Sequence, residues 1–94
     1  MMHNPPHPGE TLKEAIENIP MTVTEFAVHI GVSRNTLSRV LNCRAGITAE
    51  MSIKLTEAFG QPTPDFWFKL QNSHDFWQAS RTKRKRVAKL PIAA

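Results

Sequence analysis

The sequence predicts an all-α protein whose single domain contains five helices. Three observations support this prediction. Apolar residues recur at helical spacing in five segments, capping residues flank most of these segments, and no segment alternates apolar and polar residues as a strand would. A chain of 94 residues can enclose one modest core. We therefore expect residues 1–80 to form one domain and residues 81–94 to form a basic, flexible tail.

The first two helices are indicated by apolar stripes with local start and stop signals. The first stripe consists of Leu12, Ala15, Ile16 and Ile19. Pro20 is expected to end this helix. Thr22 and Glu25 have the spacing of a capping box, so the second helix should begin directly after Thr22. Its predicted buried residues are Val23, Phe26, Ala27 and Ile30. Gly31 suits the left-handed conformation that ends a helix.

The third and fourth helices follow the same logic. Ser33 is a favourable N-cap for a helix over residues 34–42, in which the apolar residues are Leu37, Val40 and Leu41. Thr48 should cap the fourth helix, and Gly60 should end it. The apolar stripe of this helix is made of Met51, Leu55, Ala58 and Phe59.

The fifth helix should begin at Thr63-Pro64-Asp65, where an N-cap, a first-turn proline and an acid occur in order. One predicted face contains Phe66, Leu70 and Trp77 with Trp67 beside them, and another contains Phe68, Phe76 and Ala79. Two apolar sides imply either a break near Asn72-Ser73 or cover on both sides. The aromatic residues are expected in the core, and a dimer interface is predicted at Phe68, Phe76 and Trp77. Alternatively, Phe68 packs inside the protomer under the arm that holds Pro5 to Pro8.

Charge is distributed unevenly along the chain. The net charge is +4, yet residues 81–94 hold six basic side chains and no acid, whereas residues 1–80 hold six basic and eight acidic side chains. The domain itself is therefore not basic. Between Phe26 and Ala49 there is no carboxylate, and Arg34, Arg39 and Arg44 all lie in this window. Such a local absence of acids is what a phosphate-facing surface requires.

Residues 23–42 have the pattern of a helix, a tight turn and a second helix. In this helix-turn-helix arrangement the second helix fits the major groove of DNA, which is about 12 Å wide. Its outward side chains suit base and phosphate contacts, because guanidinium groups pair with guanine and an amide pairs with adenine. The predicted DNA-binding residues are Ser33, Arg34, Asn35, Thr36, Ser38, Arg39 and Arg44. Arg39 has an alternative partner in a carboxylate of the fourth helix, and Arg44 is as well explained by a phosphate contact as by solvation.

Three longer motifs, HPGETLKEAI, MTVTEFAVHIGVSRNTLSRVLNCRAGITAEMSIKLTEAFG and PDFWFKLQNSHDFWQA, make residues 7–80 resemble the HigA antitoxin family. The resemblance implies a phage-repressor-like domain that forms a homodimer on operator DNA, represses its own operon and neutralises a HigB-type toxin that cleaves mRNA. It also places the family's DNA-reading positions on Arg34, Asn35, Thr36, Ser38 and Arg39. Val23 departs from the polar residue often found at the start of the second helix. The basic tail is not part of the shared pattern.

Catalysis and metal binding find no support in the sequence. Cys43 is the single cysteine and has no adjacent base, so we expect it to be inert packing. Pro5 and Pro6 prevent His3 and His7 from acting as helical metal ligands. His29 and His74 have no companion ligands in sequence and are expected to be solvated or hydrogen-bonded. We therefore expect no enzyme activity, no metal and no cofactor.

The chain start has no signal-peptide pattern, and no apolar run is long enough for a membrane span, so we expect a cytoplasmic protein. Three alternatives to an antitoxin remain: a stand-alone repressor, a protein-interaction module without sequence-specific DNA binding, and an RNA binder acting through the tail. The tail itself is either merely solvated, a nonspecific DNA clamp, or a segment that folds on a partner.

Overall fold

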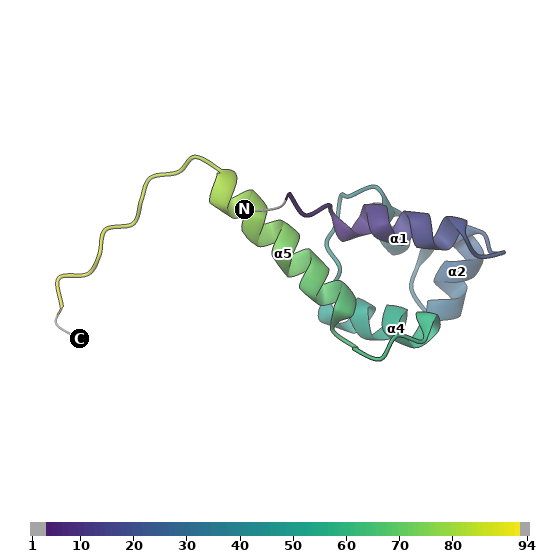
Figure 1. Ribbon diagram of the computed structural model, residues 1–94. Helices are drawn as coiled ribbons and strands as arrows, with labels where there is room; N and C mark the ends of the chain where they lie inside the picture. The colour runs from purple at the N-terminus through teal and green to yellow at the C-terminus, as the bar shows by residue number, and fades with distance from the viewer. Residues whose placement is uncertain (1–3, 93–94) are drawn as a thin grey trace.

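Five α-helices make up the regular secondary structure of the computed structural model, which describes residues 4–92 (Figure 1). In chain order they are α1 (Pro8–Glu17), α2 (Val23–Ile30), α3 (Arg34–Leu41), α4 (Ala49–Phe59) and α5 (Phe66–Arg81). No strand occurs among these described residues. The predicted all-α, five-helix architecture is confirmed.

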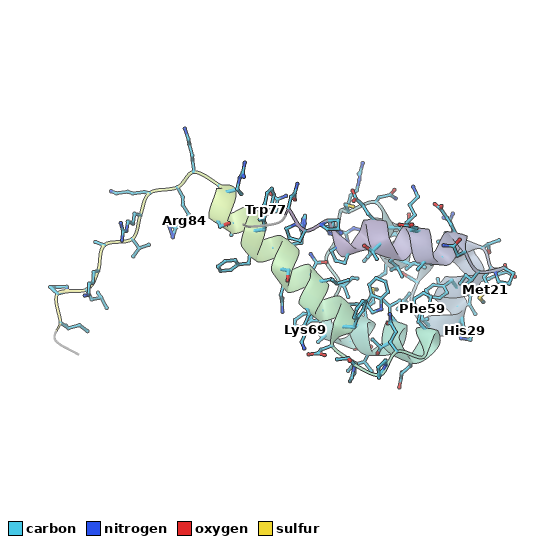
Figure 2. The ribbon with its side chains drawn as sticks, viewed as in Figure 1. Met21, His29, Phe59, Lys69, Trp77 and Arg84 are labelled. Carbon is cyan, nitrogen blue, oxygen red and sulfur yellow. The ribbon has the colours of Figure 1, made fainter. Side chains whose placement is uncertain are left out.

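One apolar core lies between the five helices. Leu12, Leu37 and Leu55, from α1, α3 and α4, are completely buried at its centre. The remaining buried apolar residues are Ile16, Phe26, Ala27, Ile30, Val40, Leu41, Ile47, Met51 and Trp67. The Phe59 ring lies between those of Phe26 and Trp67, with centroid distances of 5.6 and 5.9 Å, and Figure 2 shows it pointing into the interior. Through Trp67, α5 closes the core beside α4.

The predicted helix caps are present at three N-termini. The side chains of Thr22, Ser33 and Thr48 each accept a hydrogen bond from the backbone amide three residues later. Gly31 and Gly60 end α2 and α4 with φ angles of 74° and 69°. A side chain at either glycine would be strained in this left-handed conformation. These short-range interactions place α2, α3 and α4 where the sequence predicts them.

The prediction that Pro20 ends the first helix was wrong by three residues. The helix ends at Glu17, because Asn18 caps it and the side-chain amide of Asn18 donates to the Glu14 carbonyl at 3.1 Å. Ile19 lies beyond the helix and still packs against the core. At the other end, His7 caps the helix by accepting from the Gly9 amide at 2.9 Å.

The start and the buried face of the fifth helix also differ from the prediction. Residues 63–65 form a turn in which the Phe66 amide donates to the Thr63 carbonyl, and α5 begins only at Phe66. The helix continues without a break past Asn72 and Ser73. Of the predicted face, Trp67 is buried and Leu70 packs against the core, but Phe66 is exposed, and the second buried residue is Gln71, which was not predicted.

The second half of α5 extends past the other helices, as Figure 1 shows, so it is not covered on two sides. Phe76 there is 72% exposed. Residues 82–92 contain no helix or strand, and all of them are exposed. None of the helices in the described part of the chain is long and apolar enough to cross a membrane.

Candidate nucleic-acid interface

The pair α2 and α3 forms a helix-turn-helix unit with tightly bonded ends. The Thr22 amide donates to the Glu25 carboxylate at 2.8 Å, and this bond lowers the pKa of Glu25. At the turn, the Val32 amide donates to the Ala27 carbonyl at 3.0 Å, and Ala27 is buried where the helices approach. The Lys54 ammonium of α4 also donates to the Gly31 carbonyl at 3.3 Å. The turn between α2 and α3 is therefore held by one hydrogen bond within the helix-turn-helix unit and by one from α4.

The inner face of α3 is anchored as the sequence predicts. Leu37, Val40 and Leu41 are buried, and α3 packs against both α1 and α2. The opposite face carries Arg34, Asn35, Thr36 and Arg39, which are all exposed. The α3 helix, which is held by its packing against α1 and α2, thus exposes two guanidinium groups and one side-chain amide to solvent.

Three predicted contact residues already make hydrogen bonds within the chain. Ser33 Oγ accepts from the Thr36 amide at 3.0 Å and donates to Thr36 Oγ1 at 2.8 Å. Ser38 is half-buried, and the Asn42 amide group donates to its carbonyl at 2.9 Å and to its hydroxyl at 3.3 Å. Ser33 already donates its single hydroxyl proton to Thr36, whereas Thr36 and Ser38 act only as acceptors in these bonds and keep their hydroxyl protons for a phosphate oxygen. Ser33 acts first as the cap that orients α3.

Arg39 does not take the alternative partner considered from sequence. Both ion pairs found among the described residues lie elsewhere, at Lys54–Glu50 and Lys69–Asp65. Instead, Arg39 and Arg44 line one polar surface depression together with Ser38 and Asn42. Asn42 was absent from the predicted contact set, although its spacing of four residues from Ser38 places it on the same helix face.

One carboxylate lies at the edge of this surface. Glu17 of α1 lines a second depression together with Lys13, Arg34 and Ser38. The acid-free window therefore holds along α3 itself but not across the neighbouring α1. Since Lys13 lies in the same depression, the positive charges there outnumber the negative one.

Known proteins are similar to this chain in both sequence and fold. A helix-turn-helix family model matches residues 12–66. Antitoxin HigA-1 of Vibrio cholerae is 39% identical over 82 residues, which are 86% of this chain and 75% of that protein. Virulence-associated protein A' of Dichelobacter nodosus is 40% identical over 77 residues, covering 82% of this chain and 67% of that protein.

Two solved structures extend the comparison to the fold. An addiction module antidote protein of the HigA family from Coxiella burnetii superposes with a TM-score of 0.76 at 35% identity, over 82% of this chain and 84% of that one. The chain belongs to the HigA family of helix-turn-helix proteins. The HigA antitoxin of Pseudomonas aeruginosa, solved with the higBA promoter, gives a TM-score of 0.74 at 30% identity, over 80% of this chain and 82% of that one.

This HigA-family chain also holds polar contacts that the sequence did not reveal. Gln71 of α5 is buried, and its Oε1 accepts from the Ile47 amide at 2.9 Å while its Nε2 donates to Asp75 Oδ1 at 2.9 Å. The connection between α3 and α4 is thereby tied to α5. Because the partners are 24 residues apart, no local pattern predicts this bond.

Two histidines join the N-terminal arm to α5. His74 Nδ1 lies 3.0 Å from the Pro5 carbonyl oxygen, and the rings of His7 and His74 meet edge to face at 5.0 Å. Burial and the neighbouring His74 lower the pKa of His7 below its ordinary value of 6.5. His3 lies outside the described residues. Within residues 4–92, no three metal-ligating side chains gather in one place.

The prediction that Cys43 is packing was wrong. Its thiol is exposed, and its φ angle of 60° lies in the left-handed region. This conformation follows from the end of α3, where the Arg44 amide donates to the Arg39 carbonyl at 2.8 Å. The turn at Cys43 therefore sets where Arg44 leaves the helix.

Proposed function

We propose that this protein is an antitoxin that binds its operator as a homodimer, represses its own operon and neutralises a HigB-type toxin that cleaves mRNA. The observation that carries the DNA-binding part is the exposed face of α3, where Arg34, Asn35 and Arg39 project from a capped and packed helix. The likeness to a HigA antitoxin that was solved with its promoter supports the same assignment.

The position of each side chain suggests its role on DNA. Arg34 and Asn35 lie in the first turn of α3, the part of a recognition helix that meets base edges in the major groove. A guanidinium group suits guanine, and an amide suits adenine. Arg39 and Arg44 lie further along with Ser38 and contact the phosphates or a neighbouring base. Thr36 binds phosphate through its hydroxyl group and Ser33 through its backbone amide, because the Ser33 hydroxyl proton is donated to Thr36.

We place the dimer contact on α5, at Phe76 with Phe68 and Trp77 nearby. Phe76 is the most exposed aromatic side chain of the described chain, and aromatic residues are favoured at interface centres. Trp77 is half-buried beneath the Arg81 guanidinium, 5.1 Å from the ring centroid. A two-fold dimer should set the two copies of α3 about 34 Å apart, which is one turn of DNA, or a multiple of that distance.

Fluorescence anisotropy with the protein's own promoter and with a shuffled duplex tests the assignment. The full chain should prefer the promoter, and Arg34→Ala should weaken promoter binding by about 1–3 kcal/mol and reduce the preference. Lys69→Ala is the matched control, because it removes one exposed charge from α5 and should leave binding unchanged (Figure 2). Equal loss on both duplexes would restrict Arg34 to phosphate contact. A full chain without any promoter preference would refute the proposed function.

The toxin-neutralising part requires a separate experiment. A small basic protein encoded beside this gene should arrest growth when expressed alone, and coexpression of this chain should restore growth and yield a complex that survives size-exclusion chromatography. Promoter binding without any such neighbour or complex would instead support the stand-alone repressor.

A further inference from the structure

The segment that follows α5 carries a concentrated positive charge without internal neutralisation. Its basic side chains, all exposed, are Lys83, Arg84, Lys85, Arg86 and Lys89. No carboxylate follows Asp75 in the sequence. Among the described residues, these side chains take part in no ion pair, and Arg84 donates only to the neighbouring Lys85 carbonyl. We call residues 83–89 the basic segment.

The basic segment begins close to the candidate DNA-binding surface. Cys43, directly after α3, lines one surface depression together with His74 and Gln78 of α5. Arg81, the last residue of α5, follows Gln78 by less than one helical turn. Arg44 adjoins Cys43 on the other side. Gln78 therefore lies near the end of α3, and Figure 1 shows the last turn of α5 and the following chain extending past the other helices rather than folding back over them.

We propose that the basic segment binds DNA phosphates next to the operator, beyond the base pairs that α3 reads; the location of these phosphates rests on the proposed function. An extended chain from Arg81 to Lys89 reaches about 26–29 Å. This length matches roughly eight base pairs of duplex at about 3.4 Å each. The basic segment of each protomer can therefore follow less than one turn of DNA.

Duplex DNA fits this segment better than a membrane surface does. Four consecutive basic residues, 83–86, directly follow the end of the domain, before the first apolar residue, Val87. Amphipathic helices that lie on membranes have separate apolar and basic faces, whereas residues 82–92 form no helix. An extended chain of closely spaced cations instead suits the closely spaced phosphates of a nucleic-acid backbone.

The test compares two duplexes, one limited to the operator and one carrying eight additional base pairs of unrelated sequence on each side. The variant replaces Lys83, Arg84, Lys85 and Arg86 with glutamine. On the flanked duplex we expect at least a tenfold weaker Kd and a salt dependence reduced by about two or more in log–log slope. On the operator-only duplex the two proteins should differ by less than threefold. Circular dichroism should confirm that both are equally helical.

A second variant, with Val87→Ser, Leu90→Ser and Ile92→Ser, keeps every charge and should bind the flanked duplex like the full chain. The proposal is overturned if the glutamine variant keeps the affinity and the salt slope of the full chain on flanked DNA. It is equally overturned if the segment affects only binding to phosphatidylserine vesicles or to an RNA duplex. If the full chain shows no preference for the operator but the glutamine variant still binds DNA more weakly, the proposed function is rejected. Phosphate binding by the basic segment is then retained.

Discussion

Gly9 of α1 packs directly against the backbone carbonyl of Val40 in α3, so closely that a Cβ atom at Gly9 would overlap the Val40 oxygen. Since both groups belong to helix backbones, neither can turn away. The contact sets the distance between α1 and the helix that we propose to read DNA.

Gly9→Ala should therefore force α1 and α3 apart and lower the free energy of unfolding by about 1–3 kcal/mol, as other overpacked cores do. Thermal unfolding should show a Tm lower by several degrees. Glu14→Ala on the exposed side of α1 is the control and should change stability by less than about 0.5 kcal/mol. Equal Tm values for Gly9→Ala and the parent protein would mean that α1 and α3 can move apart without a loss of stability.

Two substitutions of Ser33 should distinguish its role as the N-cap of α3 from its proposed contact with DNA. Ser33→Ala removes the acceptor for the Thr36 amide and should cost about 0.5–2 kcal/mol of stability. Ser33→Asp retains a capping acceptor and should fold as stably as the parent. Because the new carboxylate faces phosphates, Ser33→Asp should nevertheless bind the promoter at least tenfold more weakly in anisotropy. Unchanged binding by this variant would place Ser33 away from the DNA.

Loss of the buried Gln71 acceptor should destabilise the protein. Gln71→Met keeps most of the volume but leaves the Ile47 amide without its partner, which should cost about 1–3 kcal/mol in denaturant unfolding. Asp75→Asn keeps an oxygen for Gln71 Nε2 and should cost less. Hydrogen exchange at the Ile47 amide should accelerate in Gln71→Met alone. Slow exchange in that variant would show that another acceptor replaces the glutamine.

The His7 cap should make stability depend on pH. The folded state lowers the pKa of His7, so the unfolded chain binds more protons between the two pKa values. Stability should therefore fall as pH decreases below about 6.5, toward the lowered folded-state pKa. Asn at position 7 can still accept from the Gly9 amide but does not titrate. His7→Asn should show a smaller Tm difference between pH 7.5 and pH 5.5 than the parent, and an equal difference would mean that His7 does not cause the pH dependence.

Phe76→Asp should disrupt the proposed dimer without unfolding the protomer. Phe76 is 72% exposed, so its replacement removes little of the core. Sedimentation at micromolar concentration should shift from dimer to monomer, while the circular dichroism spectrum stays constant. Asn72→Asp, at an exposed position of α5, adds the same single negative charge and is the control. A Phe76→Asp protein that remains dimeric would move the two-fold axis away from this part of α5.

Local sequence signals predicted the central part of this fold well. Thr22, Ser33 and Thr48 cap the helices that follow them, and Gly31 and Gly60 end two of them. Each of these interactions closes within a few residues, so it depends on neighbours that the sequence itself specifies. The outward position of Arg34 and Asn35 follows for the same reason, since Leu37 and Val40 fix the opposite face. Their contacts with DNA stay a prediction.

The tertiary structure decided what α5 does. The sequence contains aromatic residues on several sides of this helix, and periodicity alone selected the face of Phe66 and Trp77. Trp67, predicted beside that face, packs against Phe59 in the core. The unpredicted Gln71 also turns inward, because the buried Ile47 amide needs an acceptor. Bonds between residues tens of positions apart exist only once the helices are docked. The helix-turn-helix unit was therefore determined by the sequence locally, whereas the orientation of α5, and with it the exposure of Phe76 and the origin of the basic segment, was decided by the tertiary fold.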